Sequence, residues 1–293
     1  MKNTAKILGL ALGVVLSWQS VNAKTILISD IDDTIKLSHI LDKTDAFWNV
    51  FRTENVYLGM NTAYKLLKEQ DKSIEFFYVS NGPKAGVGPL HDEFLDDNKF
   101  PDKDNAFYRK FGYPDPNNPG KKILGLDPNH KVNVISEIIE STKPDLVILV
   151  GDNGEQDPFK YDTIVNKYPN TKFLSQIHMP YYTGQIEKQY AGQALQGDQE
   201  GFATSYDMIL SWFDKGIINA EAVVTFEESF RKGLAKEDKY EDKGEMAFPD
   251  WTDCRDVKLD ASPILHLPSA VQDQARLTFS IVHERCQIPA LKH

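Results

Sequence analysis

The 293-residue chain is poor in cysteine and short of positive charge, and each shortage excludes a class of protein. Two cysteines are too few for a small disulfide-built scaffold or for a zinc site made mainly of thiolates. Lys and Arg number 33 against 43 Asp and Glu, so the formal net charge of −10 argues against nucleic acid as a partner. Beyond residue 23, no stretch is long and apolar enough to cross a membrane as a helix.

The remaining composition is that of an ordinary globular protein. Hydrophobic residues make up 41% of the chain and charged residues 26%, which is enough apolar mass to build a core and argues against extensive disorder. No internal repeat is apparent. The length suits one large domain, or one domain with an accessory region.

Residues 1–23 have the pattern of a secretory signal peptide. Lys2 and Lys6 give a positive start, residues 7–16 are apolar, and small residues precede Lys24. The apolar run is about half of the roughly 20 residues that span a bilayer, although an uncleaved anchor is the alternative. We therefore expect cleavage after Ala23, no transmembrane anchor after cleavage, and a periplasmic or secreted protein.

Short apolar runs alternate with helical patterns over the first part of the chain. Such runs, rich in β-branched residues, are typical of strands buried on both faces of a parallel sheet. We expect strands at 25–29, 76–79, 146–150 and 173–177, and helices at 62–68, 132–140 and 158–168. This order predicts an α/β fold with a doubly wound parallel sheet. The Gly- and Pro-rich segment 83–130 is interpreted as loops with one short helix at 91–97, unless an element is hidden there.

After about residue 183 the alternation of apolar runs and helical patterns gives way to mainly helical patterns. We expect an α/β domain at 24–183 and a mostly helical C-terminal region at 184–293, whose role the sequence leaves open. Helices are predicted at 202–214 and 220–234, and the mixed-charge run 236–245 is interpreted as a solvated helix face or loop. Cys254 and Cys286 are expected to form a disulfide in an exported protein, with two buried free thiols as the alternative.

Acidic and polar residues follow the three best strands. Asp30 and Asp32 follow the first strand, Ser80 ends the second, and Asp152 follows the third. The carboxyl ends of parallel strands lie at one edge of a sheet, so these groups should converge there. Two carboxylates ~4 Å apart repel by about 4 kcal/mol at an effective dielectric near 20, so the cluster needs protons or a cation. All-oxygen ligands favour Mg²⁺.

A phosphate ester is the natural further ligand of such a site. The cation offsets the phosphate charge, and an aspartate can attack phosphorus to form an aspartyl-phosphate. Phosphoryl transfer also needs hydrogen-bond donors around the equatorial oxygens. The Ser80 hydroxyl, nearby backbone N–H groups and one lysine are the candidates.

The order Asp-x-Asp-x-Thr, strand-Ser, Lys and Gly-Asp-x-x-x-x-Asp resembles the four motifs of the haloacid-dehalogenase-like phosphatases, which have a Rossmann-like core. The sequences of three segments resemble those of the phosphatidate phosphatase catalytic domain first known from fungal actin-patch proteins. These segments are Ile28-Ser-Asp-Ile-Asp-Asp-Thr-Ile-Lys36, Phe77-Tyr-Val-Ser-Asn-Gly-Pro83 and Leu149-Val-Gly-Asp-Asn-Gly-Glu-Gln-Asp-Pro-Phe-Lys-Tyr161. The resemblance covers residues 25–177 and implies a Mg²⁺-dependent phosphatase acting on a lipid or small-molecule phosphate ester.

The resemblance also implies a role for each motif position. Asp30 would be the nucleophile and a metal ligand. Asp32 would be the general acid and base, with its backbone carbonyl on the metal. The remaining positions would hold the phosphoryl group (Ser80, Asn81 and Lys131), complete the metal site (Asp152) or support these groups (Thr34 and Asp157). Lys121 and Lys122 are alternative candidates for the lysine, although Lys131 opens the helix before the third strand.

One departure from the family pattern concerns the substrate. Lipid phosphatases of this type have Ser-Asn-Ser-Pro followed by an aromatic residue, whereas this chain has Ser80-Asn-Gly-Pro-Lys-Ala-Gly86. The acidic chain also has little attraction for anionic membranes. A small soluble phosphomonoester is therefore the alternative substrate, and a non-catalytic phospho-ligand-binding protein is the alternative function.

Several residues near the motifs have both a functional and a structural interpretation. His39 and His91 could relay protons but are expected to be exposed or hydrogen-bonded structural residues. Asp33 could support the site but is expected to cap the loop. The aromatic residues of segment 47–51 could form a lid but are expected to lie in the core. Tyr181-Tyr182 could form a substrate platform or pack against the C-terminal region.

Overall fold

The protein is described by a computed structural model that covers residues 24–115, 118, 120–237 and 243–290. The expected signal peptide at residues 1–23 lies outside the described residues. No helix in the described part of the chain has both the length and the apolar character that a bilayer span requires.

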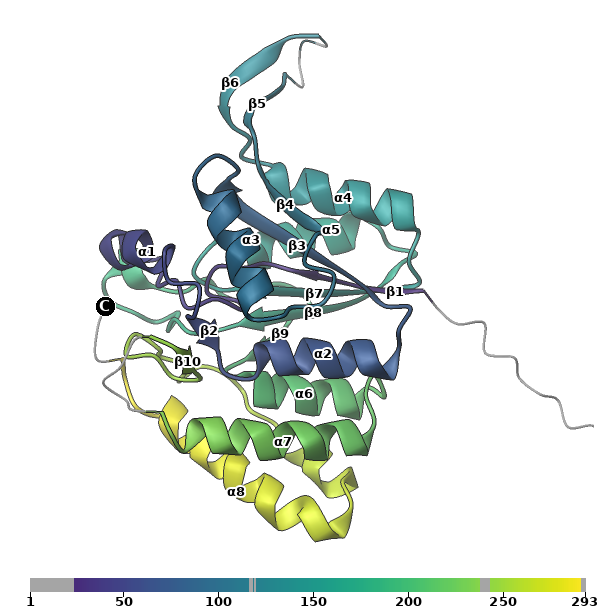
Figure 1. Ribbon diagram of the computed structural model, residues 1–293, viewed down its shortest axis with the longest axis vertical. Helices are drawn as coiled ribbons and strands as arrows, with labels where there is room; N and C mark the ends of the chain where they lie inside the picture. The colour runs from purple at the N-terminus through teal and green to yellow at the C-terminus, as the bar shows by residue number, and fades with distance from the viewer. Residues whose placement is uncertain (1–23, 116–117, 119, 238–242, 291–293) are drawn as a thin grey trace, which may run out of the picture.

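A six-stranded sheet with parallel neighbours forms the centre of the fold, in the order β4-β3-β1-β7-β8-β9 (Figure 1). From β1 the chain builds outward to β3 and β4 on one side, and later to β7, β8 and β9 on the other. Ligands bind beyond the carboxyl ends of such sheets, where the winding direction changes. The strands are β1 (Thr25–Ser29), β3 (Glu75–Pro83), β4 (Ala106–Arg109), β7 (Leu146–Asp152), β8 (Lys172–His178) and β9 (Glu200–Phe202).

Helices cover both faces of the sheet and enclose two hydrophobic clusters (Figure 1). On one face, α4 (His130–Thr142) and α5 (Asp157–Lys167) bury Ile135 and Ile164 against β1 and β7. The opposite cluster includes side chains from the other large helices, which are α2 (Met60–Gln70), α3 (Val87–Asp97), α6 (Ser205–Asp214), α7 (Ala220–Leu234) and α8 (Ser269–Cys286). The predicted α/β architecture with a parallel central sheet is confirmed.

The segment 83–130 contains more structure than its Gly and Pro content suggested. It holds α3, the sheet strand β4 and a hairpin of β5 (Phe111–Pro114) and β6 (Lys122–Leu126). The hairpin projects away from the body of the molecule (Figure 1). The prediction of loops with one helix was therefore wrong, because these strands are too short to show a clear alternation of apolar and polar residues.

The C-terminal region is joined to the same fold by strand pairing, and a disulfide closes a loop within it. Its β9 pairs with β8, and β10 (Glu245–Met246) pairs with β2 (Val56–Tyr57). Cys254 and Cys286 form the predicted disulfide. The predicted helices at 202–214 and 220–234 correspond to α6 and α7, whereas α8 was not predicted. The domain boundary after residue 183 stays a prediction.

Candidate active site

The carboxyl ends of β1, β3 and β7 bring the motif residues together. Asp30 follows β1 directly, and its backbone N–H donates to the carbonyl of Val150 in β7 at 2.8 Å. Asp152 ends β7, Ser80 lies in the second half of β3, and Asp157 begins α5. Because neighbouring strands are parallel and in register, residues far apart in the sequence meet at one edge of the sheet.

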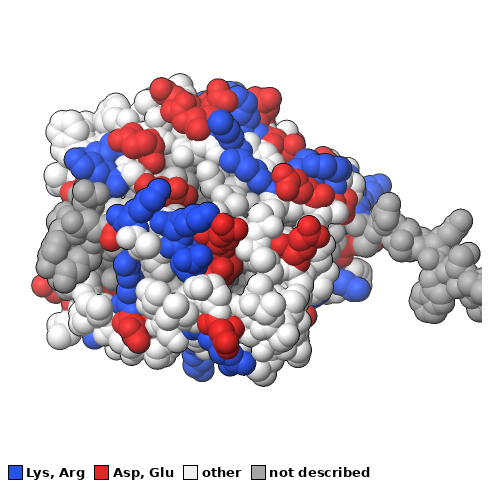
Figure 2. Space-filling view, turned by 60° about the horizontal axis from the view of Figure 1, so that its bottom comes forward, with Lys and Arg blue, Asp and Glu red and all other residues white. Residues whose placement is uncertain are grey.

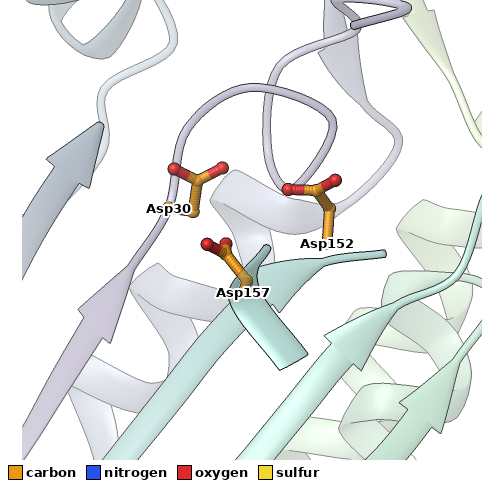
Figure 3. Close-up of side chains that lie close together, drawn as sticks. All are labelled: Asp30, Asp152 and Asp157. Carbon is orange, nitrogen blue, oxygen red and sulfur yellow. The ribbon is translucent and has the colours of Figure 1, made fainter. Parts of the chain in front are cut away.

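Three buried aspartates form the centre of this edge. Asp30, Asp152 and Asp157 each offer a carboxylate oxygen, and these oxygens lie within 4.8 Å of one another. Figure 3 shows the three carboxyl groups turned toward a common point. One oxygen of Asp152 and one of Asp157 (Oδ2 in each) have no hydrogen-bond partner among the residues that the structure describes. Burial raises the pKa of Asp30 and of Asp152 well above the usual range, because a charged carboxylate is poorly solvated there.

The donor set of this cluster fits a hard divalent cation. Carboxylate oxygens are the ligands that Mg²⁺ and Ca²⁺ take in proteins, and a cation removes the repulsion among closely spaced carboxylates. The two unpartnered buried oxygens supply an independent reason, because a buried polar atom without a partner is costly. Asp32 contributes no carboxylate oxygen to this cluster, and its side chain turns toward other partners.

Lys131 is the lysine that the fold brings to the acids. Its buried ammonium lies 2.7 Å from Oδ1 of Asp30 and 2.5 Å from Oδ1 of Asp157. Burial alone would lower the pKa of Lys131, but the surrounding carboxylates raise it well above the usual value. Lys121 and Lys122 are exposed on the hairpin. Lys131 lies in the first turn of α4, and α4 packs on the face of the sheet beside β1.

Asp32 lies between two serines and a histidine. Its carboxylate accepts a hydrogen bond from the Ser38 hydroxyl at 2.7 Å and a long one from the Ser80 hydroxyl at 3.4 Å, while Nε2 of His91 lies 3.3 Å away. Burial raises the pKa of Asp32, but the charge of His91 and the hydrogen bond from Ser38 outweigh it and hold the pKa below the usual range. Asp32 is therefore ionised in the free protein at neutral pH.

Asp33 holds the loop that carries Asp30 and Asp32. It has a positive φ of 53°, and its carboxylate accepts backbone N–H bonds from residues 38–40 at 2.6–3.0 Å. The Tyr181 hydroxyl donates to the same carboxylate at 2.5 Å. The loop-capping interpretation of Asp33 is confirmed. The Thr34 hydroxyl donates to Asp30 at 3.3 Å and so steadies that side chain within the loop.

The second motif forms a turn that presents donors beside Asp32. The Ser80 hydroxyl accepts a hydrogen bond from the backbone N–H of Gly82 at 2.9 Å. The Asn81 amide donates to Glu155 at 2.6 Å, and the side chain of Arg109 donates to the Asn81 carbonyl. A Cβ at Gly82 would lie 2.8 Å from Val87, which shows why glycine suits this turn. The links from Glu155 and Arg109 were not predicted from the sequence.

His91 and His39 are both buried, and each has a partner near the first motif. His91 lies on α3, packed against Asp32, and the expectation of a purely structural histidine missed this position. A histidine on the inward face of a helix just after the second motif was the available signal. His39 contacts Asp45 at 2.8 Å and stacks on Trp251 of the C-terminal region, 4.5 Å between ring centroids. The structural interpretation of His39 is confirmed.

The aromatic residues after the first motif lie outside the core. Phe47, Trp48 and Phe51 are each more than half exposed, on and just after α1 (Lys43–Asn49). The prediction that they form part of the core was wrong, because in the described part of the chain their recorded ring contacts are with one another. Tyr181, in contrast, is buried and donates its hydroxyl to Asp33. Tyr182 packs against the C-terminal region, where the guanidinium of Arg255 lies 4.4 Å from its ring centre.

Comparison with known proteins places the matched segment on this site. Residues 25–175 match the family described as "Phosphatidate phosphatase APP1, catalytic domain". Over 148 residues the chain is 34% identical to the phosphatidate phosphatase APP1 of Saccharomyces cerevisiae, a match that covers 49% of this chain and 24% of that protein. The chain thus aligns with about a quarter of the length of this relative.

Among solved structures, the chain resembles one described as "Structure of DsGPDH of Dunaliella salina" with a TM-score of 0.36. The two are 17% identical over 64% of this chain and 28% of that chain, which is too distant to inform the site. The family match includes Asp30, Ser80, Lys131 and Asp152, the residues that the fold brings together. On its catalytic segment, the chain belongs to the family of the phosphatidate phosphatase APP1 catalytic domain.

Proposed function

We propose that the chain is a Mg²⁺-dependent phosphatase that hydrolyses a phosphate monoester through an aspartyl-phosphate on Asp30. The observation that supports this most is the buried group of three aspartates with an ammonium beside Asp30. A structural ion pair would need neither three carboxylates nor unpartnered oxygens at the end of a sheet. Membership of a phosphatase family agrees with this reading of the geometry.

In the first step an oxygen of Asp30 attacks phosphorus as the bond from phosphorus to the ester oxygen breaks. The electron pair of that bond stays on the ester oxygen, which takes a proton from Asp32 and leaves as an alcohol. In the second step Asp32 takes a proton from a water molecule as the water oxygen attacks phosphorus. The bond from phosphorus to Asp30 then breaks, which releases phosphate and restores both carboxyl groups. Ser80, the backbone beside Asn81, and Lys131 would hold the equatorial oxygens.

Asp32 has to be protonated for the first step, although it is ionised in the free protein. A phosphoryl dianion next to Ser80 adds negative charge beside Asp32 and raises its pKa. Substrate binding would therefore load Asp32 with the proton that the leaving group needs. His91, 3.3 Å from Asp32, is placed to pass that proton on.

Asp30, Asp152 and Asp157 would hold the cation, together with the backbone carbonyl of Asp32. When bound, Mg²⁺ would neutralise charge on the transferring phosphoryl group. It would also lower the pKa of Asp30, so that this buried carboxyl can act as a nucleophile. Asp157 has a second task in this proposal, because it also orients Lys131.

The catalytic domain would comprise residues 24–183, and residues 184–293 would support it. The disulfide between Cys254 and Cys286 suits an oxidising compartment, so we place the protein in the periplasm or the medium. A phosphatidate-like lipid phosphate is the proposed substrate, in line with the family. A small soluble phosphomonoester is the second candidate, because Gly82 stands where the lipid phosphatases have serine.

The test is hydrolysis of an aryl phosphate by the purified chain, with and without EDTA. We expect chelation to abolish activity and added Mg²⁺ to restore it. Asp30→Asn keeps the shape but lacks the nucleophile, so its turnover should fall roughly 10⁴-fold or more. Glu137→Gln, on the exposed face of α4, is the control. Full activity with EDTA, or in Asp30→Asn, would refute the mechanism, and tight phosphate binding without turnover would favour the non-catalytic alternative.

The substrate is then identified by comparing detergent-dispersed phosphatidate with nucleotides and sugar phosphates. A strong preference for phosphatidate would support the lipid assignment. Preference for a soluble ester would replace it and leave the chemistry at Asp30 intact. The comparison needs the same enzyme preparation, so that only the substrate differs.

A further inference from the structure

An exposed cluster of three aromatic rings stands beside the site. Phe47, Trp48 and Phe51 are 58%, 59% and 55% exposed. Their ring centroids lie 5.2 Å apart for Phe47 and Trp48 and 5.6 Å apart for Phe47 and Phe51, so the rings form one patch. We call these residues the aromatic cluster. Large exposed aromatic patches of this kind mark surfaces that contact an apolar partner.

The hairpin β5–β6 exposes three further apolar side chains. Phe111 pairs with Leu126 across the strands, and Leu124 lies beside the irregularity in the register of these strands. They are 74%, 37% and 81% exposed, in the order Phe111, Leu126 and Leu124. Among the described residues, these three side chains belong to none of the hydrophobic clusters of the fold.

The hairpin is also basic, although the chain as a whole is acidic with a net charge of −10. Residues 109–126 include Arg109, Lys110, Lys121 and Lys122 but Asp115 as the one acid. The three lysines are exposed. A polypeptide that combines exposed apolar side chains with surrounding lysines fits an anionic lipid–water interface, where the rings enter the headgroup region and the ammonium groups meet phosphates.

Both surfaces are attached to the motif loops. The Asn49 amide, at the end of α1, donates to the carbonyl of Ser38 at 3.3 Å, and the Ser38 hydroxyl bonds to Asp32. At the base of the hairpin, Arg109 donates to the carbonyl of Asn81. In Figure 1, α1 lies beyond the left-hand ends of the central strands, and the hairpin rises above β4. The two apolar surfaces therefore flank the edge of the sheet where Asp30 and Ser80 lie.

Among the described residues, α7 and α8 expose no Phe or Trp side chain of this kind. Figure 2 turns α7 and α8 toward the viewer, and there basic and acidic side chains are interspersed. Exposed Leu265 and Leu277 belong to separate elements of the C-terminal region and carry no aromatic neighbour in the described contacts. Single exposed leucines of this kind are ordinary on protein surfaces.

We propose that the aromatic cluster and the β5–β6 hairpin dock the catalytic edge onto an anionic lipid surface. The inference deepens the proposed function, on which it rests, by stating how substrate reaches the site: the enzyme works at the interface, and a lipid phosphate enters from the bilayer. The hairpin lysines supply the attraction that the acidic chain as a whole does not have. Each lysine near an anionic surface should raise the partition coefficient about fivefold, so three give roughly 100-fold.

The test measures vesicle binding directly, without turnover. It uses the chain from Lys24 onward, which contains every described element, so that the apolar segment 7–16 does not itself bind lipid. Sedimentation is measured with phosphatidylcholine vesicles and with vesicles that also contain phosphatidylglycerol. We expect binding to the anionic vesicles, weakened by salt, and a loss of roughly 100-fold in the triple variant Lys110→Gln, Lys121→Gln, Lys122→Gln.

A second measurement identifies the side that faces the lipid. Trp212 and Trp251 are buried, so quenching of tryptophan fluorescence by brominated lipid should come from Trp48 and vanish in Trp48→Phe. A Phe47→Ser, Trp48→Ser, Phe51→Ser variant should lose most binding, whereas Leu265→Ser with Leu277→Ser should bind as the parent does. Circular dichroism of each variant confirms that it is folded.

Three results would overturn the docking proposal. These are equal binding to both kinds of vesicle, unchanged binding in the aromatic or lysine variants, and quenching that persists in Trp48→Phe. Sedimentation equilibrium without lipid provides another check, because loss of a dimer in the aromatic variant would assign the cluster to a second copy of the chain. A chain that binds vesicles but hydrolyses no phosphate ester would refute the proposed function and leave the docking intact.

Discussion

Replacing Lys131 by methionine tests how the acidic centre is held together. The Lys131 ammonium is buried against Asp30 and Asp157, and Oε2 of Glu155 lies 3.8 Å away. Methionine keeps much of the volume but removes the charge and the donors. Removing one partner of a buried ion pair typically costs about 3–5 kcal/mol, because the remaining charge is left uncompensated. We expect a loss of free energy of unfolding in this range for Lys131→Met.

The assay is urea denaturation followed by circular dichroism, with a second lysine as control. Lys167 lies on α5 and is half-exposed, with its ammonium 3.5 Å from Glu140. An exposed pair of this kind contributes about 0–1 kcal/mol, so Lys167→Met should change the unfolding midpoint little. A loss in Lys131→Met no larger than in Lys167→Met would refute the reasoning that Lys131 compensates buried charge.

The pH dependence of the Lys131→Met loss follows from the raised pKa values of its partners. Burial already raises the pKa of Asp30 and of Asp157, and the opposing charge of Lys131 is gone in the variant. An acid whose folded-state pKa is raised loses stability as pH rises and regains it when it is protonated. The loss should therefore shrink from pH 8 toward pH 5, and Mg²⁺ should stabilise the variant more than the parent at pH 8. A loss that grows as pH falls would contradict this account.

Two further substitutions test the surroundings of the first motif. His91→Asn should raise the pKa of Asp32, because the charge of His91 holds it down. The alkaline limb of the pH–rate profile, where Asp32 loses the proton that the leaving group needs, should then move to higher pH, while the exposed His283→Asn leaves it in place. If His91→Asn leaves the pH–rate profile unchanged, His91 does not set the pKa of Asp32. Tyr181→Phe removes a buried hydroxyl that donates to the loop aspartate and should cost about 1–3 kcal/mol in thermal or urea unfolding, whereas Tyr182→Phe should cost far less. Equal losses of unfolding free energy in the two variants would show that the hydrogen bond from Tyr181 does not stabilise the loop.

Short-range patterns in the sequence were enough to place the strands and the acids at their ends. The apolar runs that became β1, β3 and β7 are buried on both faces, and no tertiary information is needed to see that Asp30 and Asp152 follow them. Helices that connect successive strands make the strands parallel, so the carboxyl ends of β1 and β7 lie at the same edge of the sheet. The same reasoning predicted that Ser80 lies at this edge, because it follows the apolar run of its own strand.

Other features depended on which distant segment covers a given face. Local sequence could not show that β9 and β10 of the C-terminal region join the body of the fold, because strands of two or three residues carry no readable periodicity. It could not show that Trp251 stacks on His39, because the two are far apart in the chain. Helical spacing predicted that the aromatic residues after the first motif lie in a core, yet within the described residues their side chains are more than half exposed on and just after α1.

The sequence by itself therefore determined the parallel α/β order, the acidic strand ends and the pair of cysteines, because each depends on neighbours along the chain or on residue chemistry. Only the tertiary structure decided that Lys131 rather than Lys121 or Lys122 meets Asp30, since burial of an ammonium depends on carboxylates contributed by other strands. It also decided that His91 meets Asp32, for the same reason. Charge compensation and solvent exposure are properties of the assembled fold.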